Sequence, residues 1–118
     1  MTSAQHESLA AGRWRTFSLM DQLANVGSEV ERALTWLDKN NSKYSHLAFL
    51  RALELLSLTI ADPRNSRRLK ELTRTREALL DYFLGENEFK STANSWRSYF
   101  YGFAYASALE KSRRTNRS

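Results

Sequence analysis

The chain has 118 residues with one proline, four glycines, no cysteine and a formal net charge of +5. This length and the scarcity of helix-breaking residues favour a single all-α domain, and the lack of cysteine excludes disulfides, thiolate zinc sites and cysteine nucleophiles. No segment approaches the ~20 apolar residues of a membrane-spanning helix, and the N-terminus lacks the apolar core of a signal peptide, so we expect a cytoplasmic protein without membrane contact.

The first sixteen residues are polar, small and aperiodic, which predicts a flexible arm over residues 1–16. A helix is predicted from an N-cap at Ser18 to about Lys39, with Asp21 in the first turn, where the helix dipole favours a carboxylate. Its apolar residues recur in alternating steps of three and four and form a seam that should face other helices: Leu19, Leu23, Val26, Val30, Ala33 and Leu37.

The second helix is predicted from about Tyr44 to Ala61, with Ser42 or Ser45 as its N-cap. Apolar residues occupy nearly all of its circumference, which indicates a central helix covered by its neighbours on every side. Asp62 and Pro63 end this helix, because proline disfavours helical geometry in the residue before it.

The third helix is predicted over about 66–84, with Gly85 as its stop, and one apolar stripe is formed by Leu69, Leu72, Leu79, Leu80 and Phe83. The fourth begins near Thr92 or Asn94 and is rich in aromatic residues. A solvated basic tail is predicted over residues 111–118.

Short connections between four helices predict an all-α, four-helix up-and-down antiparallel bundle over residues 17–110. The second and fourth helices would leave apolar surface in water, so a homo-oligomer or a complex with another protein is expected. Within the fourth helix, Trp96, Phe100 and Phe103 are about one turn apart and fit either a core or a dimer interface.

Signatures of catalysis are missing from the sequence. The two histidines, His6 and His46, are too few for a conventional zinc or di-iron site, and His46 is expected to be structural or exposed. The glycines are isolated and follow no phosphate-loop spacing. We therefore expect no catalytic residue, no metal and no cofactor.

Arg76 falls in the middle of the apolar stripe of the third helix. An unpaired buried guanidinium is costly, so we expect an ion pair with Glu54 or Glu29 that fixes the register of the helices. The alternative is that these three residues form a polar binding site inside the bundle.

Arginines also gather at the start of the third helix, where Arg64, Arg67, Arg68 and Arg74 share one face, and Arg113 and Arg114 in the tail are further cations. Such a ridge fits a nucleic-acid backbone, because clustered cations gain affinity by releasing counterions from phosphates. The alternative is a solvated helix face balanced by Glu71, Glu77 and Asp81. Tyr101 and Tyr105 are the candidates for stacking on bases.

Four segments together resemble a family of small uncharacterised prokaryotic all-helical proteins: Ser18–Ala33, Arg51–Arg64, Arg68–Leu72 and Gly85–Phe89. This resemblance implies a prokaryotic origin and a helical fold, and it carries no site residues. A looser likeness is to the HEPN class of helical domains, some of which cut RNA through an Arg-x4-6-His motif. No arginine stands at that spacing before either histidine, so the likeness implies a non-catalytic role.

Three functions are compatible with these patterns. The sequence favours a non-enzymatic helical interaction protein, either a homodimer or a subunit of a larger assembly. The first alternative is a subunit that binds the backbone of RNA or DNA through the arginine ridge and the basic tail. The second alternative is a small-ligand binder or an enzyme with a polar site around Arg76.

Overall fold

The computed structural model describes residues 12–117, and it confirms an all-α fold with no strand among these residues. Residues 12–14 form one helical turn. The longer elements are α2 (Leu19–Asp38), α3 (Ser42–Ala61), the 3₁₀ helix η1 (Pro63–Arg68), α4 (Leu69–Leu84) and α5 (Ala93–Arg117). In the part of the chain that the structure describes, none of the helices combines the length and apolarity needed to cross a membrane.

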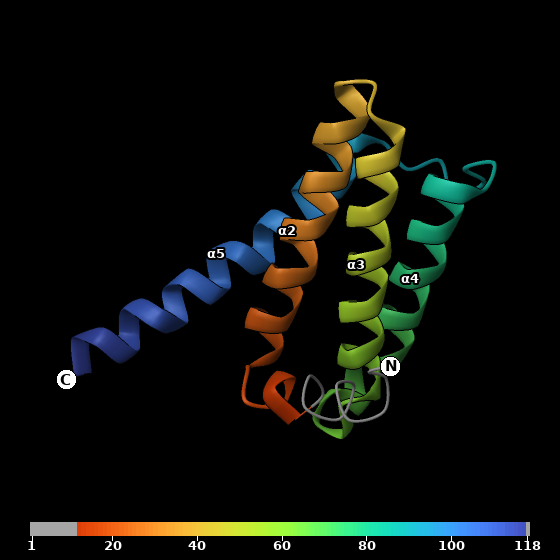
Figure 1. Cartoon of the computed structure of the whole chain (residues 1–118). Helices are drawn as coiled ribbons and strands as arrows, with labels where there is room; N and C mark the ends of the chain where they lie inside the picture. Colours follow the sequence, from red (N-terminus) through yellow and green to blue (C-terminus); the bar gives the residue numbers. More distant parts are fainter. Residues whose placement is uncertain (1–11, 118) are drawn as a thin grey trace, which may run out of the picture.

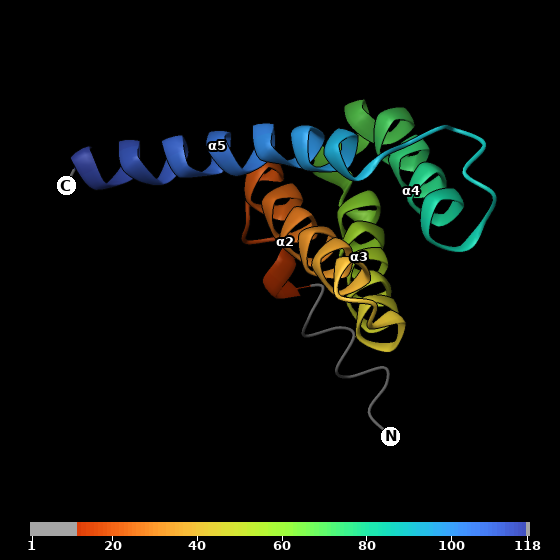
Figure 2. The same ribbon diagram turned by 90° about the horizontal axis from the view of Figure 1, so that it is seen from above.

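Helices α2 and α3 form an antiparallel hairpin, and α4 lies beside α3 (Figure 1). Helix α5 crosses this layer steeply and its C-terminal part projects away from the body of the protein (Figures 1 and 2). The predicted four-helix up-and-down bundle is therefore not confirmed, because only three of the helices run alongside one another.

Gly27 explains why α5 crosses α2 so closely. A Cβ atom built on Gly27 would lie 2.7 Å from Cβ of Phe100, so any larger residue at this position would push the two helices apart. Phe100 fills the notch above Gly27 and is itself buried. The contact holds α5 across α2, with Trp96 buried one turn earlier.

The predicted N-caps of the helices are confirmed in part. The Ser18 hydroxyl accepts a hydrogen bond from the backbone N–H of Asp21, which confirms the predicted N-cap of α2. The predicted cap of α3 is wrong, since Asn41 caps this helix, while Ser45 is buried and donates to the Ala33 carbonyl. An amide or hydroxyl one position away competes equally for a free N–H group.

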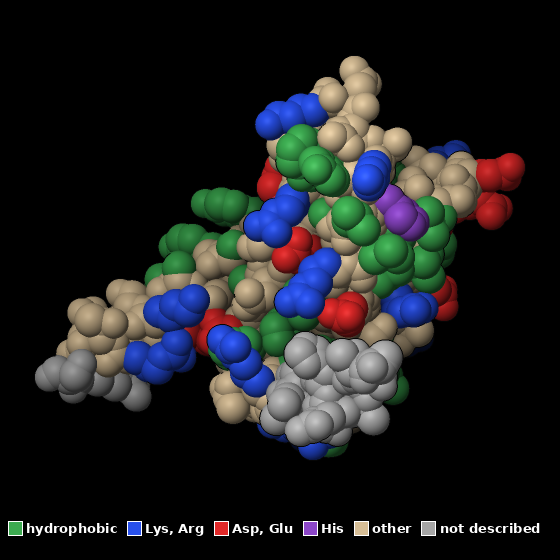
Figure 3. All heavy atoms as spheres, viewed as in Figure 1, with side chains coloured by type: hydrophobic (Ala, Val, Ile, Leu, Met, Phe, Trp, Pro, Cys, Tyr) green, Lys and Arg blue, Asp and Glu red, His purple; other side chains and the backbone are tan. Residues whose placement is uncertain are grey.

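The core combines apolar residues from all four long helices, and its most deeply buried members include Leu23, Leu34, Phe49, Leu56, Leu72 and Leu79. Three details of the sequence-based prediction are wrong. Leu37 is exposed and does not extend the seam of α2. Leu69 is largely exposed and does not extend the stripe of α4. Helix α3 is not covered on every side, because Leu47 and Leu50 are 54% and 45% exposed and Figure 3 shows hydrophobic side chains at the surface over α3, beside its histidine.

The structure describes part of each predicted chain end. In the predicted arm, Trp14 is buried and its indole Nε1–H donates to Oγ1 of Thr59 at 2.9 Å, while residues 1–11 lie outside the described part. In the predicted basic tail, residues 111–117 are helical and continue α5.

Candidate functional site

A groove of about 630 Å³ lies between η1, α4 and the start of α5, and we call it the basic groove. Four cations line it, namely Arg67, Arg68, Lys70 and Arg74, together with one carboxylate, Glu71. Its aromatic lining residues are Phe89, Trp96 and Tyr99. The groove is therefore positively charged and partly aromatic, a combination suited to ligands that carry both phosphates and flat rings.

Three of the four cations are available to a ligand. Arg67, Lys70 and Arg74 are exposed, and none of them forms an ion pair with another described residue. Lys70 and Arg74 are one helical turn apart, so their charges point to the same side of α4, about 6 Å from one another along the axis.

Glu71, the groove's carboxylate, is already engaged. The Arg68 guanidinium lies 2.9 Å from Oε1 of Glu71, and the Tyr99 hydroxyl donates to Oε2 at 2.8 Å. The hydrogen bond from Arg68 is the main cause that lowers the pKa of Glu71, so this carboxylate is ionised at neutral pH. It neutralises Arg68 and leaves the other three cations uncompensated.

Tyr99 and Thr75 form a fixed polar floor. The Thr75 hydroxyl donates to the Glu71 carbonyl at 2.9 Å and lies 3.1 Å from the Tyr99 hydroxyl. Burial raises the pKa of Tyr99 to about 12, so its hydroxyl keeps its proton and remains a donor to Glu71. Each hydroxyl therefore already has an acceptor on Glu71 before any ligand arrives.

The outer wall is a loop, residues 85–92, that joins α4 to the start of α5 (Figure 2). The Asp81 carboxylate accepts the backbone N–H groups of Glu88 and Phe89, both at 2.9 Å. The Asn87 side chain, on a backbone with a φ of 56°, accepts from and donates to the backbone of Ser91. These bonds fix the loop and with it the position of Phe89, which is 49% exposed.

The structure brings together only part of the predicted arginine ridge. Arg67, Arg68 and Arg74 lie on the groove, whereas Arg64 is bound to the buried Asp62 carboxylate at 2.7 Å and to the Phe17 carbonyl at 2.8 Å. The Arg64 guanidinium is also the main cause that holds the pKa of Asp62 far below its usual range. Arg64 therefore stabilises the α3–η1 corner.

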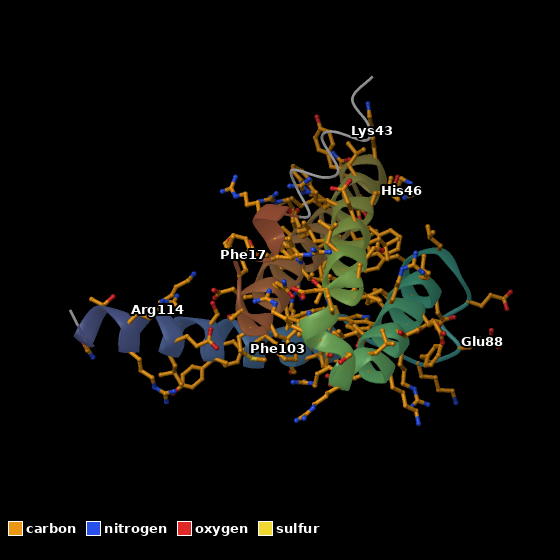
Figure 4. The ribbon with its side chains drawn as sticks, turned by 90° about the horizontal axis from the view of Figure 1, so that it is seen from below. Phe17, Lys43, His46, Glu88, Phe103 and Arg114 are labelled. Atoms are coloured by element: carbon orange, nitrogen blue, oxygen red, sulfur yellow. The ribbon has the colours of Figure 1, made fainter. Side chains whose placement is uncertain are left out.

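The basic residues of the C-terminal segment are far from the groove. Arg113 and Arg114 lie on the projecting end of α5, and Figure 4 shows Arg114 on the opposite side of the molecule from Glu88, the neighbour of Phe89 in the groove wall. Figure 1 shows the same separation between the C-terminus and α4. The ridge and the tail therefore do not form one continuous surface.

The predicted ion pair of Arg76 is wrong. Among the described residues, Arg76 has no ion-pair partner, while Glu54 pairs with Arg51 at 3.0 Å and Glu29 pairs with Arg32 at 3.2 Å. Arg76 is only half-buried, so its long stem covers apolar surface while its charge reaches water. The polar binding site predicted around these residues is therefore not assembled.

The predicted aromatic interface also differs from the structure. Trp96 and Phe100 are buried in the core of the same chain, and Phe103 is half-buried near the crossing of α5 with the body (Figure 4). The exposed aromatic residues of α5 are Tyr101 and Tyr105, whose rings stack on one another with centroids 6.5 Å apart.

Metal-binding side chains do not cluster within the described residues, 12–117. The described residues contain no cluster of three or more His, Cys, Asp or Glu side chains that could hold a metal ion. His46 is exposed on α3, as predicted, and its ring contacts Phe49 (Figure 4). His6 lies outside the described residues.

Sequence reasoning missed Phe89 and Tyr99 as parts of the site. Phe89 is the one aromatic residue in the polar connection 86–94, and its isolation among polar residues could have indicated a functional role. Tyr99 carried no such signal, because it stands in a run of aromatic residues.

The resemblance to small prokaryotic helical proteins and to the HEPN class stays a prediction. A scan against known protein families finds no matching family. A search of curated proteins and a search of solved structures also give no match. The candidate site is therefore defined here by its own residues alone.

Proposed function

We propose that the protein binds nucleic acid through its phosphate backbone, in the basic groove. The observation that carries this proposal is the set of three exposed and unpaired cations, Arg67, Lys70 and Arg74, on one edge of η1 and α4. Such a cluster gains free energy when it displaces the counterions condensed on a polyanion. The overall charge of +5 supports the approach of the same kind of partner.

Backbone recognition follows from the chemistry of the cations. Phosphate contacts position a nucleic acid and carry no sequence information of their own. Arg67 and Arg74 present planar guanidinium groups that suit paired phosphate oxygens, and Lys70 presents a point charge. Binding should therefore depend strongly on salt and weakly on sequence.

The test is a titration of a labelled oligonucleotide of about 16 nucleotides at several salt concentrations between about 50 and 200 mM. The variant Arg67→Ala/Arg74→Ala should bind more weakly and lower the slope of log K against log salt by roughly 1.4, or about 0.7 for each lost phosphate contact with a single strand. Both arginines are exposed and unpaired, so the fold should survive the change.

The matched control is Arg113→Ala/Arg114→Ala, which removes the same two charges from the far end of α5. This control should keep the wild-type slope and most of the affinity. Equal losses in both variants would show that net charge alone drives binding, and this result would overturn the groove assignment. An unchanged slope in the groove variant would overturn it as well.

A second candidate function is self-association through α5, and the projecting end of this helix supports it. Tyr101 and Tyr105 are 69% and 58% exposed on the same side of α5. Among the described residues, Ser107 donates a hydrogen bond to Asp21 and Ser18 donates one to Glu110, and these bonds tie α5 to the start of α2. Beyond them the helix continues to Arg117, and so short an extension gains stability when another helix packs on it.

The occupant in this second proposal is α5 of another copy, since closed two-fold dimers are the commonest assemblies. Sedimentation should show association that depends on concentration. Tyr101→Ser/Tyr105→Ser should remove it, and the control Leu47→Ser/Leu50→Ser, on the exposed face of α3, should not. A monomer at every concentration would contradict the proposal.

A further inference from the structure

We infer that the basic groove selects single-stranded nucleic acid, because Phe89 offers a face on which one unpaired base stacks. This inference rests on the proposed function and adds the class of ligand. It concerns the aromatic wall of the groove, whereas backbone binding concerns its cations.

Phe89 is unusual for an exposed aromatic residue, because its backbone is fixed while its ring is left open. Phe89 is 49% exposed, and its ring contacts no other aromatic ring among the described residues. The Asp81 carboxylate holds the N–H groups of Glu88 and Phe89, so the backbone beneath the ring is already ordered. Stacking of a base on Phe89 therefore costs little conformational entropy of the loop.

The residues around Phe89 suit a single-stranded nucleic acid better than a small ligand that consists of one aromatic ring. Phe89 lines the same groove as Arg67, Lys70 and Arg74, so a base on the ring and phosphates on the cations belong to one ligand. Stacking on aromatic side chains beside a cationic track is the usual way to hold single strands without sequence preference. A base inside a duplex has no free face, so a duplex gains only the phosphate contacts.

The exposed pair of tyrosines on α5, Tyr101 and Tyr105, does not line the basic groove. Tyr101 lies on the side of α5 opposite Tyr99, because two helical positions are separated by about 200°, and Tyr105, six positions after Tyr99, is about 120° away from it around the helix. Tyr101 lines a different pocket, between α2 and α5, where Arg97 is already paired with Glu31 at 2.8 Å. Neither Tyr101 nor Tyr105 lines the basic groove, so base stacking on these two rings, as the sequence predicted, would not occur beside its unpaired cations.

The experiment compares three ligands of equal length: a single-stranded oligonucleotide, the same backbone without bases, and a duplex. Wild-type protein should bind the single strand most tightly. Phe89→Ala should weaken binding of the single strand by roughly 5- to 150-fold, the effect of losing one stacked base. The same variant should leave both the affinity for the abasic strand and the salt slope unchanged.

Two further variants separate stacking from folding. Phe89→Trp should keep the preference for bases because it keeps an aromatic face, whereas Phe89→Leu should lose it although it keeps an apolar side chain. Tyr105→Ala, which removes an exposed aromatic ring from outside the basic groove, is the matched control and should bind like the wild type. Thermal unfolding of each variant checks that the fold is intact.

The outcomes distinguish the two proposals. If wild-type protein binds the abasic strand as well as the normal strand, or if Phe89→Leu matches wild type, the stacking inference is overturned while backbone binding stands. If Phe89→Ala loses affinity equally for all three ligands, stacking is overturned too. If no ligand binds with a salt dependence that Arg67 and Arg74 control, the proposed function itself fails.

Discussion

Substitution of Asp62 should strongly reduce the stability of the protein. We expect the Asp62→Ala variant to unfold at a clearly lower temperature than the wild type. The Asp62 side chain is 1% exposed, and its carboxylate accepts three kinds of contact at the α3–η1 corner. Its oxygens bind the Arg64 guanidinium at 2.7 Å, the Arg64 backbone N–H at 3.0 Å and the Gln22 amide at 3.0 Å, and it caps η1. Gln22 is fully buried and also donates to the Trp14 carbonyl.

The size of the effect follows from these contacts. Loss of an N-cap costs about 0.5–2 kcal/mol, and removal of one partner of a buried ion pair costs about 3–5 kcal/mol. Because the Arg64 side chain is 53% exposed, water replaces part of the lost interaction, and the combined cost should be about 2–4 kcal/mol. For a chain of this size the midpoint of thermal unfolding should fall by roughly 10 °C.

The assay is thermal and urea unfolding followed by circular dichroism. Asp38→Ala is the matched control, because Asp38 is also paired with an arginine, Arg97 at 3.5 Å, but is 69% exposed. That control should change the free energy of unfolding by less than about 0.5 kcal/mol. If Asp62→Ala were no more destabilising than Asp38→Ala, the argument that burial makes this ion pair important would be refuted.

Two further predictions concern helix packing and pH. Gly27→Ala should lower the free energy of unfolding by about 1–2 kcal/mol, because the new Cβ would lie 2.7 Å from Cβ of Phe100. Gly102→Ala should raise it by up to ~1 kcal/mol, because Gly102 has open space around it in α5 and alanine favours a helix. Urea unfolding of both variants measures this difference. The pKa of Asp62 is lowered in the folded state, so its stabilisation is complete above its unfolded pKa of about 4 and is lost as the pH falls further. Wild-type protein should therefore lose stability as the pH falls from about 4 to about 2, and Asp62→Asn should show a smaller fall over this range; an equal fall would assign the acid sensitivity to other carboxylates.

Local chemistry made the helix boundaries predictable. Ser18 and the pair of Asp62 and Pro63 act on groups within three residues of themselves, so their effects can be inferred without knowledge of the fold. Asn41 was missed because neighbouring serines are equally good caps by type. The choice among them depends on backbone geometry, which the turn after α2 sets.

Features that depend on distant residues were not predictable in the same way. Trp14 stands in a polar segment, and nothing near it in sequence indicates that Thr59 receives its indole N–H. Arg76 was assigned an ion pair because a helical wheel treats a whole face as buried. In the structure Arg76 is only half-buried, so the face is not fully covered at this position.

The departure from a regular bundle creates the candidate site. In an up-and-down bundle the fourth helix would lie along α4 and cover the side where Thr75 and Ala78 meet the groove. Instead, the notch at Gly27 draws α5 across α2, and only the first turns of α5 contact α4 through Tyr99 and Trp96. The cations of α4 therefore remain open beside an aromatic wall. Because one glycine sets this crossing, Gly27→Ala should weaken oligonucleotide binding as well as stability, although Gly27 lies outside the basic groove.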